Sequence, residues 1–156
     1  MSIEKAKAHL EKFGLSDRVL EFSVSSATVA LAAEAIGCRE GEIAKTLSFA
    51  VDGGAILIVA AGDAKIDNGK YKAAFSTKAK MLQFEEVEPL IGHAVGGVCP
   101  FGVNEGVPVY LDCSLKRYST VYPAAGSSQS AVRLSLSELE TASGCVGWVD
   151  VCKDPV

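Results

Sequence analysis

The chain has 156 residues, 49% of them hydrophobic and 22% charged, which is the composition of one globular domain with a sizeable core. The formal net charge is −4 and the pI about 5.2, which excludes a protein that holds nucleic acid through overall positive charge. The longest apolar run, Ala55 to Ala61, is too short to span a bilayer, and no signal peptide is expected at the first residues.

The cysteines indicate a reducing compartment. They are odd in number and widely spaced, and none forms a Cys-x-x-Cys pair; they stand at positions 38, 99, 113, 145 and 152. This pattern argues against a disulfide framework and against a zinc ribbon. We therefore expect a cytoplasmic protein.

The first part of the chain predicts two helices and a strand. Residues 19–24 predict the strand, and Ser25 and Ser26 form a cap region before the second helix, which Gly37 ends. The first helix is capped by Ser2 and stopped by Gly14. Apolar residues at helical spacing mark both helices: Ile3, Ala6, Leu10 and Phe13 in the first, and Val29, Ala32, Ala33 and Ile36 in the second.

A β-hairpin is predicted next. Residues 43–49 alternate as a half-buried strand, and Asp52-Gly53-Gly54 is a hairpin turn signal. The following run, residues 55–60, is apolar on both faces and predicts a central strand.

The rest of the chain predicts short helices and strands. The helices cover residues 68–75 and 84–91, the second interrupted by Pro89, and the strands cover 107–112, 120–124, 131–136 and 146–152. Pro108 indicates an edge strand or a strand start. Ser137 and Glu140 predict a capping box that opens a last helix ending at Gly144. Without a linker or repeat, the chain predicts a single domain, residues 1–156, of mixed α/β (α+β) class.

Lys45 is the first candidate site residue because of the strand face that it occupies. It shares that face with Ile43, Leu47 and Phe49, while Ala44, Thr46 and Ser48 share the other. An ammonium among apolar side chains has to reach water, meet an anionic partner or bind a ligand. An edge lysine that reaches water is the plain interpretation, and a site role is the alternative.

A glycine loop about fifty residues later favours the site role. Gly96-Gly97-Val98-Cys99-Pro100-Phe101-Gly102 is rich enough in glycine to present backbone N–H groups to an anion or to a carbonyl oxygen that becomes negative. Gly96, Gly97, Val98 and Cys99 each keep an N–H, and Pro100 stiffens the exit. A second set of amides and hydroxyls comes from the turn Gly126-Ser127-Ser128.

Other chemistries have less support. Cys99 is the candidate nucleophile, but the sequence fixes no histidine beside it, and free cysteines often serve as apolar fillers. His93 precedes the loop and could contact a ligand, whereas His9 is expected at the surface. No metal-ligand cluster, phosphate-binding loop or dinucleotide motif is present, so we expect neither metal nor cofactor.

Local positive charge gathers in one segment of this acidic chain. Five lysines, at positions 65, 70, 72, 78 and 80, accompany one acid, Asp67. They form either a solvated face, which the sequence favours, or a patch that contacts phosphates. Lys116 and Arg117 are the next candidates for phosphate contacts.

Together these motifs resemble the YbaK/prolyl-tRNA-synthetase-associated editing domain. The resemblance rests on Gly37, Ile43-Ala44-Lys45-Thr46-Leu47, the loop from Gly96 to Gly102, and Ala125-Gly126-Ser127, in this order over nearly the whole chain. It implies a central mixed, largely antiparallel sheet flanked by helices. It also implies a free-standing enzyme that hydrolyses the ester bond of misacylated tRNA.

The resemblance implies roles for particular residues. Lys45 is required for activity near the aminoacyl-adenosine end, the loop from Gly96 to Pro100 contacts the aminoacyl group and its carbonyl, and Thr28 and Val29 shape the amino-acid pocket. Water or a substrate group attacks, so no protein nucleophile or metal is needed. Further substrate-binding candidates are Thr46, Gly126, Ser127 and Ser128.

Two departures concern substrate choice. Members that resemble the bacterial Cys-tRNA(Pro) deacylase carry an aromatic residue near the position of Thr28. They also carry an acidic residue where this chain has Ser130-Ala131-Val132. The resemblance therefore leaves the edited amino acid open.

The leading hypothesis is a trans-editing aminoacyl-tRNA deacylase that acts on mischarged tRNA(Pro). The acidic pI predicts weak independent tRNA affinity, with a synthetase as a candidate partner. The alternatives are a non-catalytic module that binds the tRNA acceptor end or a synthetase, and a small-molecule ester hydrolase.

Overall fold

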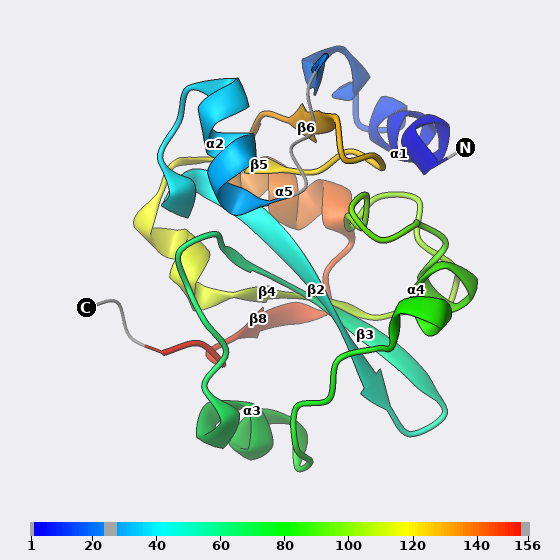
Figure 1. Cartoon of the computed structure of the whole chain (residues 1–156), viewed down its shortest axis with the longest axis vertical. Helices are drawn as coiled ribbons and strands as arrows, with labels where there is room; N and C mark the ends of the chain where they lie inside the picture. Colours follow the sequence, from blue (N-terminus) through cyan, green and yellow to red (C-terminus); the bar gives the residue numbers. More distant parts are fainter. Residues whose placement is uncertain (1, 24–27, 154–156) are drawn as a thin grey trace.

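The computed structural model describes residues 2–23 and 28–153, which fold around a mixed six-stranded sheet (Figure 1). The strand order is β7-β5-β2-β3-β4-β8, and β1 and β6 form a second, two-stranded sheet. The strands are β1 (Val19–Glu21), β2 (Ile43–Val51), β3 (Gly54–Ala61), β4 (Val109–Asp112), β5 (Thr120–Pro123), β6 (Ser130–Val132), β7 (Leu134–Ser135) and β8 (Gly147–Val149).

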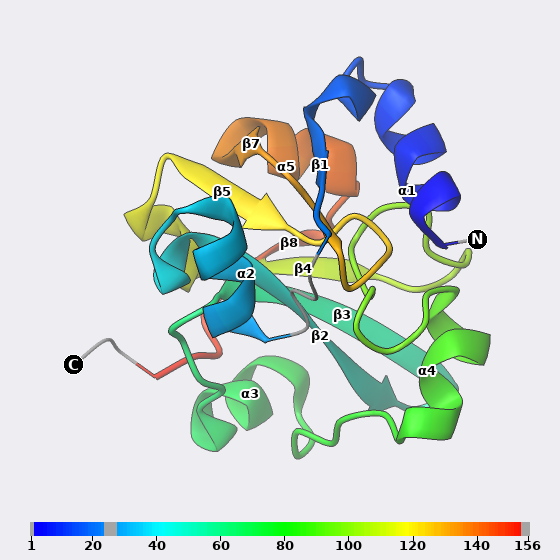
Figure 2. The ribbon, with the colours of Figure 1, turned by 45° about the horizontal axis from the view of Figure 1, so that its top comes forward.

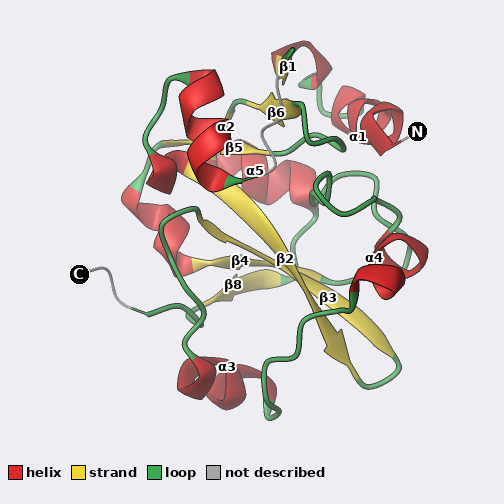
Figure 3. Cartoon of the chain, viewed as in Figure 1, coloured by secondary structure: helices red, strands yellow, loops and turns green. Residues whose placement is uncertain are grey.

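Helices flank the sheet, as Figures 2 and 3 show. The α-helices are α1 (Ser2–Glu11), α2 (Val29–Ile36), α3 (Asn68–Phe75), α4 (Phe84–Ile91) and α5 (Leu136–Ser143), and short 3-10 turns cover Ser16–Arg18, Glu40–Glu42 and Cys113–Arg117. In the described part of the chain, no helix has the length and apolar character that a bilayer crossing requires.

The β2–β3 hairpin is the centre of the fold, as predicted. Val51 pairs with Gly54 across the turn, and Gly53 has a φ of +79°, which suits glycine. Leu57, Ile58, Val59, Ala60 and Ala61 are fully buried, which confirms that β3 is a central strand.

The predicted mixed sheet is confirmed, although antiparallel pairing dominates it less than expected. Antiparallel pairs join β2 to β3 and β5 to β7, whereas β2–β5, β3–β4 and β4–β8 are parallel. Pro108 precedes β4, which lies between β3 and β8, so its role is a strand start and not an edge.

Helices α2 and α3 pack against one face of β2. Ile43 packs against α2, whereas Phe49 contacts Tyr71 of α3 with ring centroids 5.1 Å apart. Because residues 43 and 49 point to the same face, both helices cover that face, and Lys45 lies between them.

Two helix details differ from the sequence prediction, and a third is not described. The capping box of α5 is Ser135 with Glu138, not Ser137 with Glu140. Helix α4 continues through Pro89 to Ile91 instead of being interrupted. The predicted cap region at residues 25–26 lies outside the described residues, and Thr28 is the N-cap of α2.

Candidate functional site

A cleft of about 400 Å³ opens beside β2, between the start of α2 and the start of α4. Six predicted site residues line it: Thr28, Val29, Lys45, Thr46, Gly96 and Val98. Its other walls were not predicted and come from β2, β5, β6 and the segment that leads into α4: Ile43, Ala44, Leu47, Ser48, Met81, Leu82, Phe84, Val87, Val95, Tyr122, Ala124, Ser130 and Ala131, with Ala32 of α2.

The remaining predicted residues do not line the cleft. Gly97, Cys99, Pro100 and Gly126 are buried, whereas Ser127 and Ser128 are partly exposed. The two positions at which this chain departs from Cys-tRNA(Pro) deacylases do reach the cleft, through Thr28 and Ser130-Ala131. The cleft wall is therefore where substrate choice can differ.

Thr28 fixes the start of α2 at the mouth of the cleft. Its hydroxyl accepts a hydrogen bond from the N–H of Leu31 at 3.1 Å, which satisfies one of the free N–H groups of the first turn. The next residue, Val29, approaches Gly62 so closely that a Cβ on Gly62 would stand 2.7 Å from Val29 Cγ1. The helix start and the end of β3 are thus in contact.

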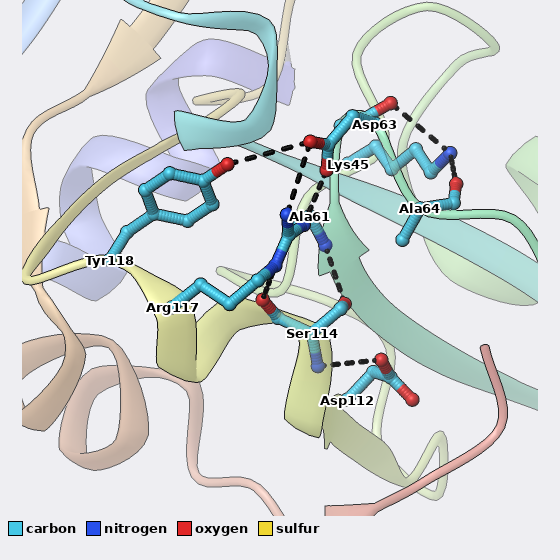
Figure 4. A network of polar contacts seen from close by, with 9 residues as sticks. Lys45, Ala61, Asp63, Ala64, Asp112, Ser114, Arg117 and Tyr118 are labelled. Atoms are coloured by element: carbon cyan, nitrogen blue, oxygen red, sulfur yellow. Dashed lines mark hydrogen bonds and ion pairs between the residues drawn. The ribbon is translucent and has the colours of Figure 1, made fainter. Parts of the chain in front are cut away.

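The Lys45 ammonium is held by backbone carbonyls at the end of β3 (Figure 4). Its Nζ donates to Ala64 O and, at 3.4 Å, to Gly62 O. β2 is an inner strand of the sheet, between β3 and β5, although β5 pairs only with its residues Ile43 and Ala44. Burial lowers the pKa of Lys45 below the ordinary lysine value, while Cys152 and Asp63 oppose that shift.

A polar network behind Lys45 holds the end of β3 in place. The Ala61 N–H donates to Ser114 Oγ at 3.0 Å, and the Ser114 N–H donates to Asp112 Oδ2 at 2.9 Å. The buried Asp112 carboxylate also accepts the N–H of Val151 at 2.8 Å. Sequence reasoning missed this network, although an aspartate directly after the apolar residues of β4 was an available signal.

Two further contacts fix the connection that carries the carbonyl partners of Lys45. Arg117 binds both oxygens of Asp63, at 2.5 and 3.2 Å, and so lowers the pKa of that carboxyl. The C-terminal segment is bound to the same connection, since the Lys153 N–H donates to Lys65 O at 2.8 Å and the Asp67 N–H donates to Val151 O at 2.8 Å.

The glycine loop turns tightly at the rim of the cleft. The Gly97 N–H donates to Ala94 O at 2.9 Å, and Gly96 has a φ of +94°. The N–H that Gly97 was expected to offer to a ligand is thus used within the loop. The N–H groups of Gly96 and Val98 have no acceptor among residues 2–23 and 28–153, so they can serve a ligand in the cleft.

Gly97 lies against the turn at residues 126–128. A Cβ on Gly97 would stand 2.5 Å from Gly126 O and 2.9 Å from Ser127 N. The N–H and hydroxyl of Ser127 are used within the turn, because the N–H donates to Ser130 Oγ at 3.2 Å and the hydroxyl donates to the same atom at 2.9 Å. The turn supports the loop from behind.

Cys99 and His93 are neighbours, which the sequence did not indicate, yet their geometry does not suit a nucleophile and its base. Cys99 Sγ lies 3.5 Å from His93 Nε2, but that nitrogen lies 2.6 Å from Phe101 O, to which it must donate. It therefore cannot accept the thiol proton. Burial raises the pKa of Cys99 to about 12 and lowers the pKa of His93, so a neutral thiol faces a neutral imidazole.

We expect Cys99→Ser to retain activity. The thiol is buried behind the cleft wall, so kcat/KM for deacylation should stay within about threefold of wild type, even if the melting temperature falls. The measurement is steady-state deacylation together with a thermal melt. A dead variant, with an aminoacyl thioester trapped on the wild-type enzyme, would instead establish Cys99 as the nucleophile.

Two further expectations concern His9 and metal ions. His9 is not a plain surface residue, since its Nε2 lies 2.6 Å from Ala142 O and its ring packs against Phe13 and Phe101. Within the described ranges, no group of three or more His, Cys, Asp or Glu side chains could hold a metal ion.

Comparison with known proteins identifies the fold and the family. The chain is 51% identical to the Bacillus subtilis (strain 168) protein YwhH over 155 residues, 99% of each chain. A crystal structure of a proposed trans-editing enzyme for prolyl-tRNA synthetase superposes with a TM-score of 0.88 at 32% identity, covering 98% of both chains. The hypothetical protein APE2540 matches with a TM-score of 0.80 at 28% identity, over 93% of this chain and 99% of its own.

The family model of the aminoacyl-tRNA editing domain matches residues 24–142, which contain the whole cleft. This span includes Lys45, the glycine loop and the turn behind it. The resemblance in the motifs and the match over the fold agree, and the chain belongs to the aminoacyl-tRNA editing domain family.

Proposed function

We propose that this protein hydrolyses the ester bond of misacylated tRNA as a free-standing enzyme. The observation that carries the proposal is the convergence of Lys45, the N-terminal turn of α2 and the glycine loop on one cleft. Family membership supports the same activity. The likeness to a proposed trans-editing enzyme for prolyl-tRNA synthetase supports tRNA(Pro) as the tRNA.

The cleft can stabilise negative charge without a protein nucleophile. When water or a substrate hydroxyl attacks the ester, its carbonyl oxygen becomes negative. Gly96, Val98 and Lys45 all line the cleft. In this proposal the N–H groups of the two loop residues receive that charge, and the Lys45 ammonium adds a positive charge. Donors that are held in position before the reaction cost no reorganisation during it.

Positioning of the tRNA has to come from local features because the chain is acidic overall. With a net charge of −4, tight independent binding of tRNA is not expected, so affinity is weak or a synthetase assists. We further propose that the protein acts in the reducing cytoplasm, as the number and spacing of its cysteines suggest.

The test is a deacylation panel with tRNA(Pro) charged with alanine, cysteine, serine, threonine or proline. We expect turnover of at least one non-proline aminoacyl group and little turnover of prolyl-tRNA(Pro). Turnover of simple aminoacyl esters alone would favour a small-molecule hydrolase. Absence of turnover for all five, with retained binding of the acceptor end, would favour the non-catalytic module.

We make a separate prediction for the lysine-rich segment, residues 65–80, as a surface that contacts tRNA phosphates. Lys70 forms an ion pair with Asp150 at 3.2 Å, whereas Lys78 and Lys80 are exposed and directly precede Met81 and Leu82 of the cleft wall. Reversing the charge of both, Lys78→Glu with Lys80→Glu, should raise KM about tenfold. The slope of the logarithm of tRNA affinity against the logarithm of salt concentration should become less steep by about 2.

The chemical step should be unaffected, because phosphate contacts position the substrate without touching the ester. Lys12→Glu, an exposed change on the loop after α1, is the matched control. Equal KM values for wild type and the double variant across a salt series would make the segment a solvated face. Of the alternative phosphate-contacting residues, Lys116 lies over the ring of Trp148 and Arg117 forms an ion pair with Asp63.

A further inference from the structure

Asp63 lies between the two residues whose carbonyls hold the Lys45 ammonium, but its own carboxylate is turned elsewhere. Lys45 Nζ donates to Gly62 O and Ala64 O, whereas the Asp63 carboxylate is directed toward Arg117, as Figure 4 shows. Within residues 2–23 and 28–153, Lys45 forms no ion pair. A carboxylate near a half-buried ammonium attracts it, so a competing contact has to hold the carboxylate in place.

That competing contact comes from the segment after β4. Arg117 donates to both oxygens of Asp63, at 2.5 and 3.2 Å, and the Tyr118 hydroxyl donates to Asp63 Oδ2 at 3.4 Å. The guanidinium is itself fixed, because its Nε donates to Ser114 O at 3.1 Å and its central carbon lies 5.0 Å from the centre of the Tyr118 ring. Because the planar guanidinium matches both carboxylate oxygens at once, it sets the orientation of the carboxylate as well as its position.

The carboxylate nevertheless acts on Lys45 through its charge. Burial lowers the pKa of Lys45, Cys152 and Asp63 oppose that shift, and Lys65 adds to it. Burial raises the pKa of the Cys152 thiol to about 12, so this thiol is neutral at neutral pH. Arg117 lowers the pKa of Asp63, so of these groups Asp63 is the one whose negative charge keeps the ammonium protonated.

We propose that Arg117 and Asp63 are positioning residues, which keep the Lys45 ammonium both charged and free to meet the substrate. Arg117 holds the Asp63 carboxylate where it favours that charge without pairing with the ammonium. Their role rests on the proposed deacylase function, in which the ammonium meets the negative charge that develops on the ester. Neither residue lines the cleft, so both act through Lys45.

Loss of the arginine alone should therefore cost more activity than loss of the whole pair. Without Arg117, the Asp63 carboxylate is free to turn and pair with the ammonium, which draws the ammonium away from its carbonyl partners and from the substrate. Without both charges no such pair forms, and the ammonium keeps its bonds to Gly62 O and Ala64 O. A purely structural contact predicts the opposite order, because the double variant would then be at least as impaired as either single variant.

The first experiment measures kcat and KM at neutral pH for wild type, Arg117→Gln, Asp63→Asn and the double variant, on the aminoacyl-tRNA that wild type deacylates fastest. We expect Arg117→Gln to lower kcat about 10- to 100-fold, because displacement of a reacting group by about 1 Å has effects of this size. Asp63→Asn and the double variant should stay within about threefold of wild type, as expected for the loss of a partly exposed ion pair. KM should change little in all three variants, because neither side chain lines the cleft.

The second experiment needs no substrate and follows the Lys45 side chain by NMR titration of isotope-labelled lysine. The Lys45 signal is identified by its absence from the spectrum of Lys45→Ala. In Arg117→Gln the pKa of Lys45 should rise, because an ion pair favours the charged form. In Asp63→Asn it should fall, because the charge that opposes the effect of burial is lost.

Arg39→Gln is the matched control. Arg39 also lies 5.0 Å from the centre of the Tyr118 ring, but its ion pair is with Glu42. The change removes the same charge from the same aromatic neighbour without freeing Asp63. It should alter neither kcat nor the pKa of Lys45.

Two results would overturn the inference. A double variant as impaired as Arg117→Gln would show that Arg117 only supports the fold of the connection after β3. An unshifted or lowered pKa of Lys45 in Arg117→Gln would show that the freed carboxylate does not pair with the ammonium. Failure of wild type to deacylate any aminoacyl-tRNA would remove the deacylase function itself, and the NMR titration would then decide alone whether Arg117 keeps the two charges apart.

Discussion

Lys45→Ala is expected to abolish deacylation, lowering kcat by about 10²- to 10³-fold or more, as the loss of one charge-stabilising group does at comparable sites. The fold should survive. The side chain is half buried and its ammonium has carbonyl partners but no ion pair in the described residues. Removal relieves the cost of burying a charge, so the melting temperature should be unchanged or higher.

The pH dependence of stability checks the same residue. Burial lowers the pKa of Lys45 in the folded protein, so the unfolded chain binds more protons between that lowered value and the ordinary lysine value. Wild-type stability should therefore rise with pH through this window relative to Lys45→Ala, and the advantage of the variant should shrink.

Lys65→Ala is the matched control, because Lys65 is exposed and lies on the same connection as Ala64. Its kcat should match that of wild type. Because the charge of Lys65 contributes to lowering the pKa of Lys45, Lys65→Ala should keep the pH window of wild type but narrow it. Full activity in Lys45→Ala would mean that the lysine only supports the end of β3.

Gly97→Val is expected to have the other large effect, a loss of both activity and stability. A Cβ at this position would stand 2.5 Å from Gly126 O and 2.7 Å from Gly126 C, and backbone atoms cannot yield as a flexible side chain can. The loop or the turn has to move. We expect at least a 100-fold lower kcat/KM and a loss of about 3 kcal/mol in the free energy of unfolding.

The matched control is Gly54→Val at the start of β3. No atom lies within 4 Å of a Cβ at that position and its φ is not positive. This variant should fold and retain activity. A Gly97→Val protein with normal activity would show that the contact between the loop and the turn is not required for the cleft.

Sequence patterns predicted the elements well where the signals are local. The bounds of α3 and α4 match the prediction, since Asp67 caps the first turn of α3 and Gly92 ends α4 with a φ of +96°. The last helix shows the limit of such signals. Ser135 with Glu138 and Ser137 with Glu140 both fit a capping box, and only packing decides between them: Leu139 and Ala142 are fully buried in the observed register.

The site was predictable in its residue types but not in its contacts. Lys45 and the glycine loop stand out in the sequence, because a charge on an apolar face and a cluster of glycines are local features. The carbonyl partners of Lys45 lie 17 and 19 residues further along the chain. The contact of Gly97 with Gly126 and the approach of His93 to Cys99 likewise depend on tertiary packing.

The hydrogen bonds of residues 151–153 have a consequence for the order in which the site becomes rigid. Their backbone bonds Asp112, Asp67 and Lys65, whereas the helix start, β2, β3 and the glycine loop all precede them in the sequence. A domain folds as a unit once its elements have emerged from the ribosome. The connection that carries the carbonyl partners of Lys45 therefore gains these hydrogen bonds only after all the cleft walls have been synthesised.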